Sequence, residues 1–291
     1  MLQQAGFKIG EDFFLIYSPE REDPGNKDFG LADIPKVVSG SSEHCADVAE
    51  VFYGELGSKT VRVSSTQAAE MTKILENTYR SVNIALVNEL KVLADLMKID
   101  IFEVIDAAAT KPFGYQAFYP GPGLGGHCIP IDPFYLTWKA REYGFHTRFI
   151  ELAGEVNTAM PDYVIAKIME ALNTKSKALS GSKVLVVGVA YKKNVGDLRE
   201  SPGVEIIDKL QKLNAKVSYH DPFVETLPKM RKFDLKMSNS KLDYESVSDY
   251  DLCVIVTDHD DVDYTVFENA ELVVDARGRL DIQEMPHVIR A

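Results

Sequence analysis

The chain has 291 residues, 45% of them hydrophobic, and a formal net charge of −12 at pH 7. This length predicts about two domains with ordinary hydrophobic cores, and the charge argues against nucleic acid or an anionic membrane as a partner. Three scattered cysteines are too few for a disulfide framework or a zinc site, and no apolar run reaches the roughly 18 residues of a transmembrane helix. No signal peptide is recognisable, so a reducing cytoplasm is the expected compartment.

The first 64 residues show the order of predicted strands, helix and loops that is typical of an α/β domain. Strands are predicted at residues 13–17, 35–40 and 61–63, with a loop rich in Asp, Pro, Gly and Asn after residue 22 and a helix over 43–55 capped by Ser42. Residues 1–6 resemble the last turn of a helix that Gly6 closes in the left-handed conformation. The cap and acidic first turn of a helix start are missing there, so we expect the chain to start partway through a domain.

The longest predicted helix covers residues 66–97, which contain neither Gly nor Pro. Its apolar residues recur at helical spacing: Met71, Leu75, Tyr79, Val82, Leu86, Leu90, Leu93 and Met97. Such a helix is about 45 Å long, so we expect it to bridge domains or to form an oligomer interface. Further helices are predicted over residues 101–109, 133–143 and 150–173, and a polar linker over 175–181.

From residue 183 onward, strands alternate with helices, which indicates a parallel doubly wound sheet. Residues 183–190 form a continuous apolar run, typical of a strand buried on both faces, and Ser201 followed by Pro202 is a strong helix start, with the helix ending near residue 213. Further strands are predicted at 216–219, at 252–257 and, as the last, at 272–275. The expected fold class is α/β: the remnant of a doubly wound domain (1–64), a central helical domain (65–174) and a C-terminal Rossmann-like domain (175–291).

One cysteine, Cys128, stands in a glycine-rich segment at residues 121–133, GPGLGGHCIPIDP. The glycines before it leave the backbone uncovered and permit positive φ, as a loop requires when a ligand or another chain segment comes close. An accessible thiol that can ionise attacks carbonyl carbons well. The alternative is a small buried hydrophobe, but the glycine-rich setting favours the nucleophile.

Several polar residues are candidates to assist this thiol. Asp132 can orient a water or accept a proton, or it can cap the helix expected after it. A nearby carboxylate opposes thiolate formation, so a cation such as Lys73 would be useful. Lys73, Asn77 and, near the same stripe, Asn88 lie on one helix face and can stabilise an oxyanion or simply be solvated. His127 suggests a Cys–His pair, although sequence neighbours seldom point the same way.

Other candidates lie at predicted strand ends, where ligands bind in α/β sheets. Glu20 follows the first strand and is either functional or an exposed structural residue. The helix start at Ser201 can hold phosphate together with Lys192, Lys193 and Arg199. Arg277 adds a cation after the last predicted strand. At each of these positions a plain surface loop is the alternative.

Taken together, these motifs resemble the UDP-glucose/GDP-mannose dehydrogenase family over nearly the whole chain. The matching segments are residues 17–21, 34–38, 73–79, 88–89, 125–133, 188–192 and 199–202. The Cys-Ile-Pro-Ile-Asp-Pro sequence at 128–133, followed by Phe-Tyr-Leu, is similar to members that act on UDP-N-acetylhexosamines. Members that act on UDP-glucose tend to have a lysine where Ile131 stands.

The resemblance implies a two-step, NAD-dependent oxidation of the sugar C6 alcohol to an acid. Cys128 would form a thiohemiacetal with the intermediate aldehyde, and its oxidation would give a thioester that water hydrolyses. Lys73 and Asn77 would stabilise the oxygen at C6, while Asp132 and Glu20 would manage water and protons. The implied contacts are Tyr119, Gly125, Gly126, Lys192 and Arg199 for substrate, Glu20 and Arg277 for cofactor, with Arg277 also at the UDP-sugar side. A homodimer through the long helix is also implied, and no metal.

Family members begin with a dinucleotide-binding β-α-β unit that carries Gly-x-Gly-x-x-Gly, and we expect this half-domain to be absent here. One alternative is therefore a truncated, catalytically incompetent protein that binds a nucleotide sugar or dimerises. Another is a thiol hydrolase that uses Cys128 and His127.

Overall fold

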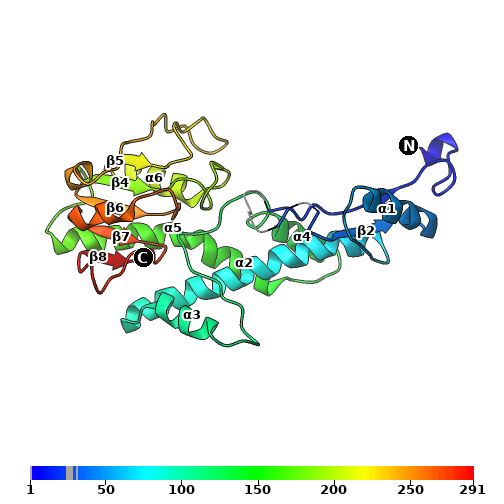
Figure 1. Cartoon of the computed structure of the whole chain (residues 1–291), viewed down its shortest axis with the longest axis horizontal. Helices are drawn as coiled ribbons and strands as arrows, with labels where there is room; N and C mark the ends of the chain where they lie inside the picture. The colour runs from blue at the N-terminus through cyan, green and yellow to red at the C-terminus, as the bar shows by residue number, and fades with distance from the viewer. Residues whose placement is uncertain (1, 24–28, 31) are drawn as a thin grey trace. The chain divides into compact units, whose positions relative to one another are not determined.

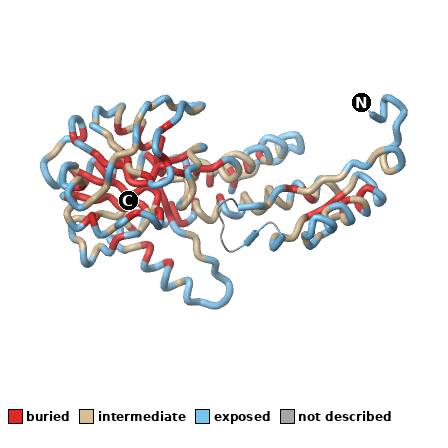
Figure 2. Tube along the Cα trace, turned by 45° about the horizontal axis from the view of Figure 1, so that its top comes forward, coloured by how far each residue is buried: buried red, intermediate tan, exposed pale blue. Residues whose placement is uncertain are grey.

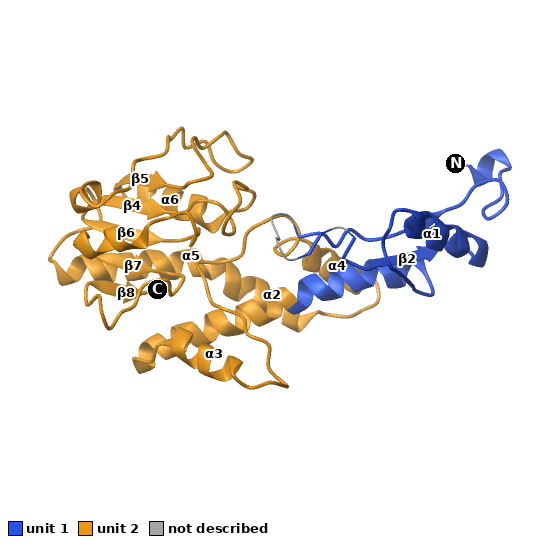
Figure 3. Cartoon of the chain, viewed as in Figure 1, with its two compact units in different colours: residues 1–79 blue, residues 80–291 orange. Residues whose placement is uncertain are grey.

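The computed structural model describes residues 2–23, 29–30 and 32–291 (Figure 1). Buried residues are concentrated around the C-terminal sheet (Figure 2). The chain divides into two compact units, residues 1–79 and 80–291 (Figure 3). The loop expected after residue 22 lies mostly outside the described residues, and the expected division into three domains stays a prediction.

The first unit contains a small sheet with the strand order β1-β2-β3. Its elements are η1 (Gln3–Ala5), β1 (Ile16–Tyr17), β2 (Lys36–Gly40), α1 (Glu43–Glu55) and β3 (Thr60–Arg62). β1 runs antiparallel to β2, and β3 runs parallel to it. Two local predictions are confirmed: the Ser42 hydroxyl accepts a hydrogen bond from the N–H of Cys45, and Gly6 closes η1 with φ of 91°.

Four helices follow, and α2 has the bounds predicted from its uninterrupted periodicity. They are α2 (Thr66–Met97), which crosses the boundary between the units, α3 (Ile101–Ala109), α4 (Asp132–Arg141) and α5 (Arg148–Thr174). α4 begins one residue earlier than predicted, with Ile131 at its N-cap position and no side-chain cap. The interpretation of Asp132 as a cap is therefore wrong. Its carboxylate lies in the first helical turn, where the helix dipole favours negative charge.

The second unit ends in a five-stranded parallel sheet with the order β5-β4-β6-β7-β8. Its elements are β4 (Lys183–Val187), α6 (Pro202–Lys212), β5 (Lys216–His220), η2 (Ser246–Asp249), β6 (Leu252–Ile255), η3 (Tyr264–Asn269), β7 (Val273–Asp275) and β8 (Val288–Arg290). The predicted Rossmann-like sheet is confirmed. The prediction that 272–275 is the last strand is wrong, because β8 adds an edge strand too short to show a pattern in sequence.

Helices and short 3₁₀ segments cover opposite faces of this sheet. Alternate residues of β4 point to the two sides, so Val184 and Val186 contact α5 and α6, whereas Leu185 and Val187 face the side of η2 and η3. Residues 175–181 are not a free linker, because Leu179 belongs to the same core as the sheet. α5 and the sheet therefore fold around one core, which explains why they lie in one compact unit.

The carboxyl ends of β4, β6 and β7 form one edge of the sheet. β4 stops at Val187 rather than at residue 190, because Gly188 turns the chain with φ of 79° against β6. A Cβ atom at Gly188 would lie 2.2 Å from the carbonyl oxygen of Thr257, so only glycine fits there. Strand order reverses at β4, and in doubly wound sheets ligands bind at such a point. The loop at residues 188–201 starts at this edge.

Candidate functional site

In the first unit, Glu20 follows β1 and its carboxylate is held by a cation and by its own backbone. The ammonium of Lys36 lies 2.9 Å from Glu20 Oε2, and the N–H groups of Arg21 and Glu22 donate to Oε1 at 2.8 Å. Partial burial opposes the charge, but these donors outweigh it and lower the pKa of the Glu20 carboxyl. Glu20 is therefore ionised at neutral pH.

The same unit brings Lys73 of α2 to the backbone of Glu20. The Lys73 ammonium donates a hydrogen bond to the Glu20 carbonyl oxygen. One turn away, Glu76 forms an ion pair with Arg21 at 2.7 Å, and Arg21 also donates to the Pro35 carbonyl at 2.8 Å. Asn77 lies four residues after Lys73 on α2. The structure thus brings Lys73 into contact with the backbone of Glu20, and the catalytic roles of Lys73, Asn77 and Glu20 stay predictions.

In the second unit, the backbone of the segment that carries Cys128 is held at two residues before the thiol, Gly121 and Gly126. Gly121 at its base bonds to Asn88 through its N–H, and Gly126 donates its N–H to the carbonyl of Arg199 at 2.8 Å. Cys128 itself is a free, half-buried thiol. Residues 121–131, here called the Cys128 loop, thus hold a reachable sulfur on a fixed backbone, which is what a nucleophile requires.

The glycines of this loop are explained by chain segments that pack closely on it. Gly126 has φ of 86°, and a Cβ atom there would lie 3.0 Å from the Tyr191 ring. At Gly125 the corresponding distance to Tyr191 Cβ is 2.5 Å. Both glycines are buried. The predicted close approach is therefore real, and the approaching group is the loop after β4.

Arg199 lies in the loop after β4 and is paired with a carboxylate. Its guanidinium pairs with Asp197 at 2.6 Å, and this hydrogen bond raises the pKa of Arg199. Whether Arg199 also contacts phosphate or substrate stays a prediction.

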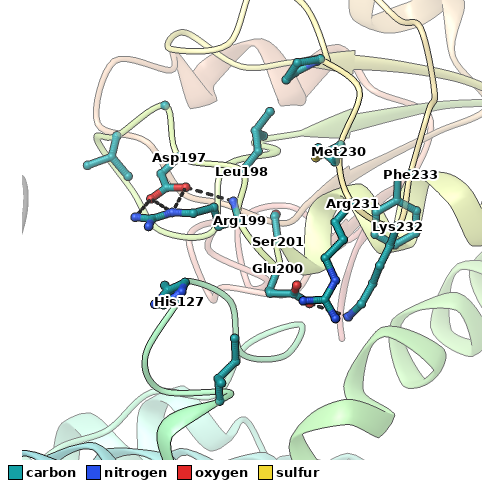
Figure 4. Close-up of a pocket in the computed structure, with 14 residues that line it drawn as sticks. His127, Asp197, Leu198, Arg199, Glu200, Ser201, Met230, Arg231, Lys232 and Phe233 are labelled. Carbon is teal, nitrogen blue, oxygen red and sulfur yellow. Dashed lines mark hydrogen bonds and ion pairs between the residues drawn. The ribbon is translucent and has the colours of Figure 1, made fainter. Parts of the chain in front are cut away.

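A cleft of about 860 Å³ lies beside the Cys128 loop. Figure 4 shows His127 on the loop opposite residues 197–201, with Arg231 and Lys232 on a third segment. Lys232 pairs with Glu200 at 2.5 Å. The cleft is large enough for a small molecule. Its lining includes the cations Arg199, Arg231 and Lys232, of which the first and last are paired with Asp197 and Glu200.

A buried Asp–His pair holds the loop after β4 in place. Asp221 accepts hydrogen bonds from the N–H groups of Val189 and Ala190 and from Nε2 of His259 at 3.0 Å, while His259 Nδ1 accepts the N–H of Asn194. These contacts assign the proton of the neutral imidazole to Nε2. Burial opposes the charge of Asp221, but the bonds from His259 and the backbone outweigh it and lower its pKa.

The helix start predicted at Ser201 is confirmed. The Ser201 hydroxyl accepts the N–H of Gly203 at 3.1 Å and donates to the carbonyl of Val189 at 2.6 Å, and Pro202 is the first residue of α6. The ammonium of Lys192 lies 6.0 Å from the centre of the Tyr191 ring. Lys192 and Tyr191 are neighbours on the loop after β4, and Tyr191 is the residue of this loop that packs against Gly125 and Gly126.

Two predicted contact residues also have structural partners. The Tyr119 hydroxyl donates to Asp106 of α3 at 2.6 Å, a bond that raises the pKa of Tyr119. Arg277 follows β7 and donates from Nε to the carbonyl of Val256 at 2.7 Å, and burial lowers its pKa. Whether either also contacts a ligand stays a prediction.

Several other expectations can be compared with the described residues. His127 forms no hydrogen bond with the Cys128 thiol there, so a Cys–His pair gains no support. Within the same residues, no group of three or more His, Cys, Asp or Glu side chains is arranged to hold a metal ion. None of the helices in the described ranges is long and apolar enough to cross a membrane.

Sequence reasoning missed Lys91 of α2, which is only 3% exposed. Its helical spacing from the apolar residues Val87 and Ala94, both buried in the structure, is the sequence signal of burial, but lysine is usually interpreted as solvent-facing. For Asn88, the sequence indicates only a position near the helix face that carries Lys73 and Asn77. In the structure both residues contact Gly121 at the base of the Cys128 loop.

Comparison with protein families gives two matches. The UDP-glucose/GDP-mannose dehydrogenase family, central domain, matches residues 67–159, and the UDP binding domain of the same family matches residues 185–282. These ranges contain α2 with the Cys128 loop and the C-terminal sheet.

Curated relatives agree with the family matches. A UDP-N-acetyl-D-glucosamine 6-dehydrogenase of Pseudomonas aeruginosa is 39% identical over 221 residues, which are 76% of this chain and 52% of the relative. A UDP-N-acetyl-D-mannosamine dehydrogenase of Methanococcus vannielii is 33% identical over 87% of this chain and 56% of the relative. The chain thus spans a little over half the length of these two relatives.

A solved structure of a UDP-D-ManNAc dehydrogenase from Pyrococcus horikoshii superposes with a TM-score of 0.83 at 29% identity, covering 96% of this chain and 65% of that one. The likeness in fold therefore extends over almost every element described above. Together with the two family matches, it establishes that the chain belongs to the UDP-glucose/GDP-mannose dehydrogenase family.

Proposed function

We propose that this chain serves the NAD-dependent oxidation of the C6 alcohol of a UDP-N-acetylhexosamine to the uronic acid, through a covalent bond to Cys128. The observation that carries the proposal is the free, half-buried thiol on a loop whose backbone is held at Gly121 and Gly126 and which borders a large cleft. The substrate class is supported by relatives named for UDP-N-acetyl-D-glucosamine and UDP-N-acetyl-D-mannosamine and by the UDP binding domain match.

The chemistry explains why a thiol is needed. Removal of a hydride from C6 and a proton from its hydroxyl gives an aldehyde. The aldehyde carbon bears one oxygen, whereas the acid needs two, so a nucleophile must add to this carbon before a second hydride can leave. The Cys128 sulfur adds to the aldehyde carbon, and the carbonyl oxygen takes up a proton, which yields a thiohemiacetal. Loss of a second hydride and a proton gives a thioester. Water adds to its carbonyl carbon, the C–S bond breaks, and the acid and the free thiol are released.

Individual side chains have distinct tasks in this scheme. Lys73 with Asn77 stabilises negative charge on the C6 oxygen. Asp132 and Glu20 accept protons and orient water. The lowered pKa of Glu20 suits a base rather than an acid. Tyr191 and Lys192, on the loop that packs against Gly125 and Gly126, are proposed substrate contacts.

NAD is the proposed hydride acceptor, and when bound it supplies the oxidising power for both steps. The described residues fit this cofactor only in part. The cleft beside the Cys128 loop has room for part of a small ligand, but no strand in the described ranges leads into a Gly-x-Gly-x-x-Gly turn at a helix start, the feature that usually holds a pyrophosphate. No step of the scheme depends on the position of the cofactor.

The covalent role of Cys128 is tested by Cys128→Ala. We expect acid formation from a UDP-N-acetylhexosamine to fall at least about 1,000-fold, as after loss of a catalytic nucleophile, while UDP binding by calorimetry stays unchanged. Cys253→Ala is the matched control, because this cysteine is buried in the sheet. A Cys128→Ala protein that produces acid at the normal rate would refute the covalent mechanism.

A homodimer through α2 is the proposed assembly. Leu86, Leu90, Leu93 and Met97 recur along one face of this helix, and all four are exposed. Burying such a stripe against a second copy would remove apolar surface from water. Sedimentation velocity tests this: Leu93→Glu should yield monomer where the unmodified chain is dimeric, and an unchanged oligomeric state would contradict the proposed interface.

A second candidate is a protein that binds a nucleotide sugar without oxidising it. It is favoured by one observation, the lack of a dinucleotide-binding turn after any strand of the described ranges. Calorimetry with a UDP-sugar and with NAD distinguishes the two candidates. Binding of the UDP-sugar alone supports this second one, and appreciable NADH production by the 291-residue chain excludes it.

A further inference from the structure

We infer that Asn88 and Lys91 of α2 are positioning residues for Cys128, because they hold both sides of Gly121 at the base of the Cys128 loop. We call Asn88, Lys91 and Gly121 the Gly121 anchor. The inference rests on the proposed function, since it assumes that the position of the Cys128 thiol matters for chemistry.

The geometry of the anchor is specific. Asn88 and Lys91 are three residues apart, so they lie on the same side of α2. The Gly121 N–H donates to Asn88 Oδ1 at 2.9 Å, and the Lys91 ammonium donates to the Gly121 carbonyl oxygen at 3.2 Å. Two side chains of one helix thus satisfy both backbone groups of a single buried loop residue, and the loop has no freedom to slide along α2.

A second layer of contacts fixes the orientation of the Asn88 amide. Its Nδ2 donates to Asn157 Oδ1 of α5 at 2.9 Å, and Asn157 Nδ2 donates to the Ser81 carbonyl at 3.1 Å. Because each nitrogen faces an oxygen, Asn88 Oδ1 must point to Gly121. Both asparagines are almost completely buried. Buried amides are costly unless bonded, so this network favours one arrangement of α2, α5 and the loop.

The side chain of Arg277, which follows β7, packs against the same loop residue. A Cβ atom at position 121 would lie 2.6 Å from its Nη1, so a larger residue there would require Arg277 to move. Further along the loop, the N–H of Gly126 is bonded to the carbonyl of Arg199. Cys128 thus comes two residues after the second of two fixed points of the loop, and a shift at Gly121 changes the backbone that leads to the thiol.

Burying a charged lysine side chain such as Lys91 costs free energy. Its side chain is buried, and no carboxylate of the described residues forms an ion pair with it. The groups that face it are Asp95 on α2, Tyr163 of α5, whose ring centre is 5.2 Å from the ammonium, Asp275 at the end of β7 and Arg277 after it. Three more charged residues line the same small cavity: Lys98, Asp100 and Arg290. Burial, reinforced by Arg277, lowers the pKa of Lys91 to about 7.

The test is the rate at which iodoacetamide alkylates Cys128 in the full chain between pH 6 and 9, followed by peptide mass spectrometry. Cys45 and Cys253 are buried and serve as internal references. In Lys91→Met, which keeps the apolar stem but cannot donate to Gly121, we expect alkylation at least about threefold faster, as for the loss of one hydrogen bond. The profile should also lose an inflection near pH 7 that the unmodified chain shows.

Lys209→Met is the matched control, because Lys209 of α6 bonds to Asp162 of α5 rather than to the loop or to a group that faces Lys91. Equal rates and profiles in Lys91→Met and the unmodified chain overturn the inference, and so does an equal change in Lys209→Met. If Lys91→Met does not fold, amide hydrogen exchange of the unmodified chain decides: slow exchange of the Gly121 N–H supports the anchor, and fast exchange refutes it. Neither measurement needs substrate or NAD, so failure of the anchor and failure of the proposed oxidation are distinguishable.

Discussion

Lys91→Met should stabilise the folded chain at low pH while it loosens the loop. An unfolded lysine has a pKa of 10.5, whereas burial lowers the pKa of Lys91 to about 7. At about 1.4 kcal/mol per pH unit, protonated Lys91 costs the folded state up to about 5 kcal/mol below pH 7. Methionine removes this cost but leaves the Gly121 carbonyl without its donor, which costs about 2 kcal/mol. The expected net gain at pH 6 is about 3 kcal/mol.

The sign of the pH dependence follows from proton binding. Between pH 7 and 10.5 the unfolded state of the unmodified chain holds more protons at Lys91 than the folded state, so its stability rises with pH in this window. The Met variant lacks this rise, and the difference should reverse at about pH 9, where the cost of burying Lys91 has fallen to about 2 kcal/mol. Urea denaturation at pH 6, 8 and 10 measures it, with the exposed lysine variant Lys98→Met as control. Equal pH slopes in the two proteins, or a less stable Lys91→Met at pH 6, would refute the reasoning.

Three further substitutions test the surroundings of Cys128. Gly126→Ala places a side chain at φ of 86° and 3.0 Å from the Tyr191 ring, so it should lower the free energy of unfolding by about 1–2 kcal/mol in urea titrations. Ser201→Ala removes the N-cap of α6 and should lower the melting temperature through a loss of about 1 kcal/mol. Arg199→Gln removes an exposed ion pair with Asp197 but keeps the backbone carbonyl that accepts the Gly126 N–H, so the free energy of unfolding in urea should fall by no more than about 1 kcal/mol; a larger loss would contradict this.

Much of the fold was predictable because its signals are local. The helix over Thr66–Met97 follows from a run of helix formers without Gly or Pro, and the start of α6 follows from Ser201 and Pro202. The strand β8 was missed because Val288–Arg290 is too short to show alternation and depends on pairing with β7. Residues 175–181 looked like a linker because a single buried apolar residue, Leu179, does not stand out in sequence.

The candidate site was predictable only in its nucleophile and its motifs. Cys128 and the glycines before it are recognisable because few other roles require that composition. The contact between Gly126 and Arg199 joins residues more than 70 positions apart, and no periodicity records it. Lys91 was overlooked for a related reason: its burial arises from the packing of α5, the Cys128 loop and the end of β7, none of which is adjacent in sequence.

These contacts have a consequence for how the thiol is placed. The base of the Cys128 loop is held by α2 through Gly121, whereas the residue two before the thiol is held by the loop after β4. That second loop is in turn fixed by Asp221 and His259. The central helices and the sheet therefore both determine the position of Cys128, and a rotation of one against the other would displace the sulfur. The shared core of α5 and the sheet opposes such a rotation, so we expect the boundary near residue 175 to act as a rigid joint rather than a hinge.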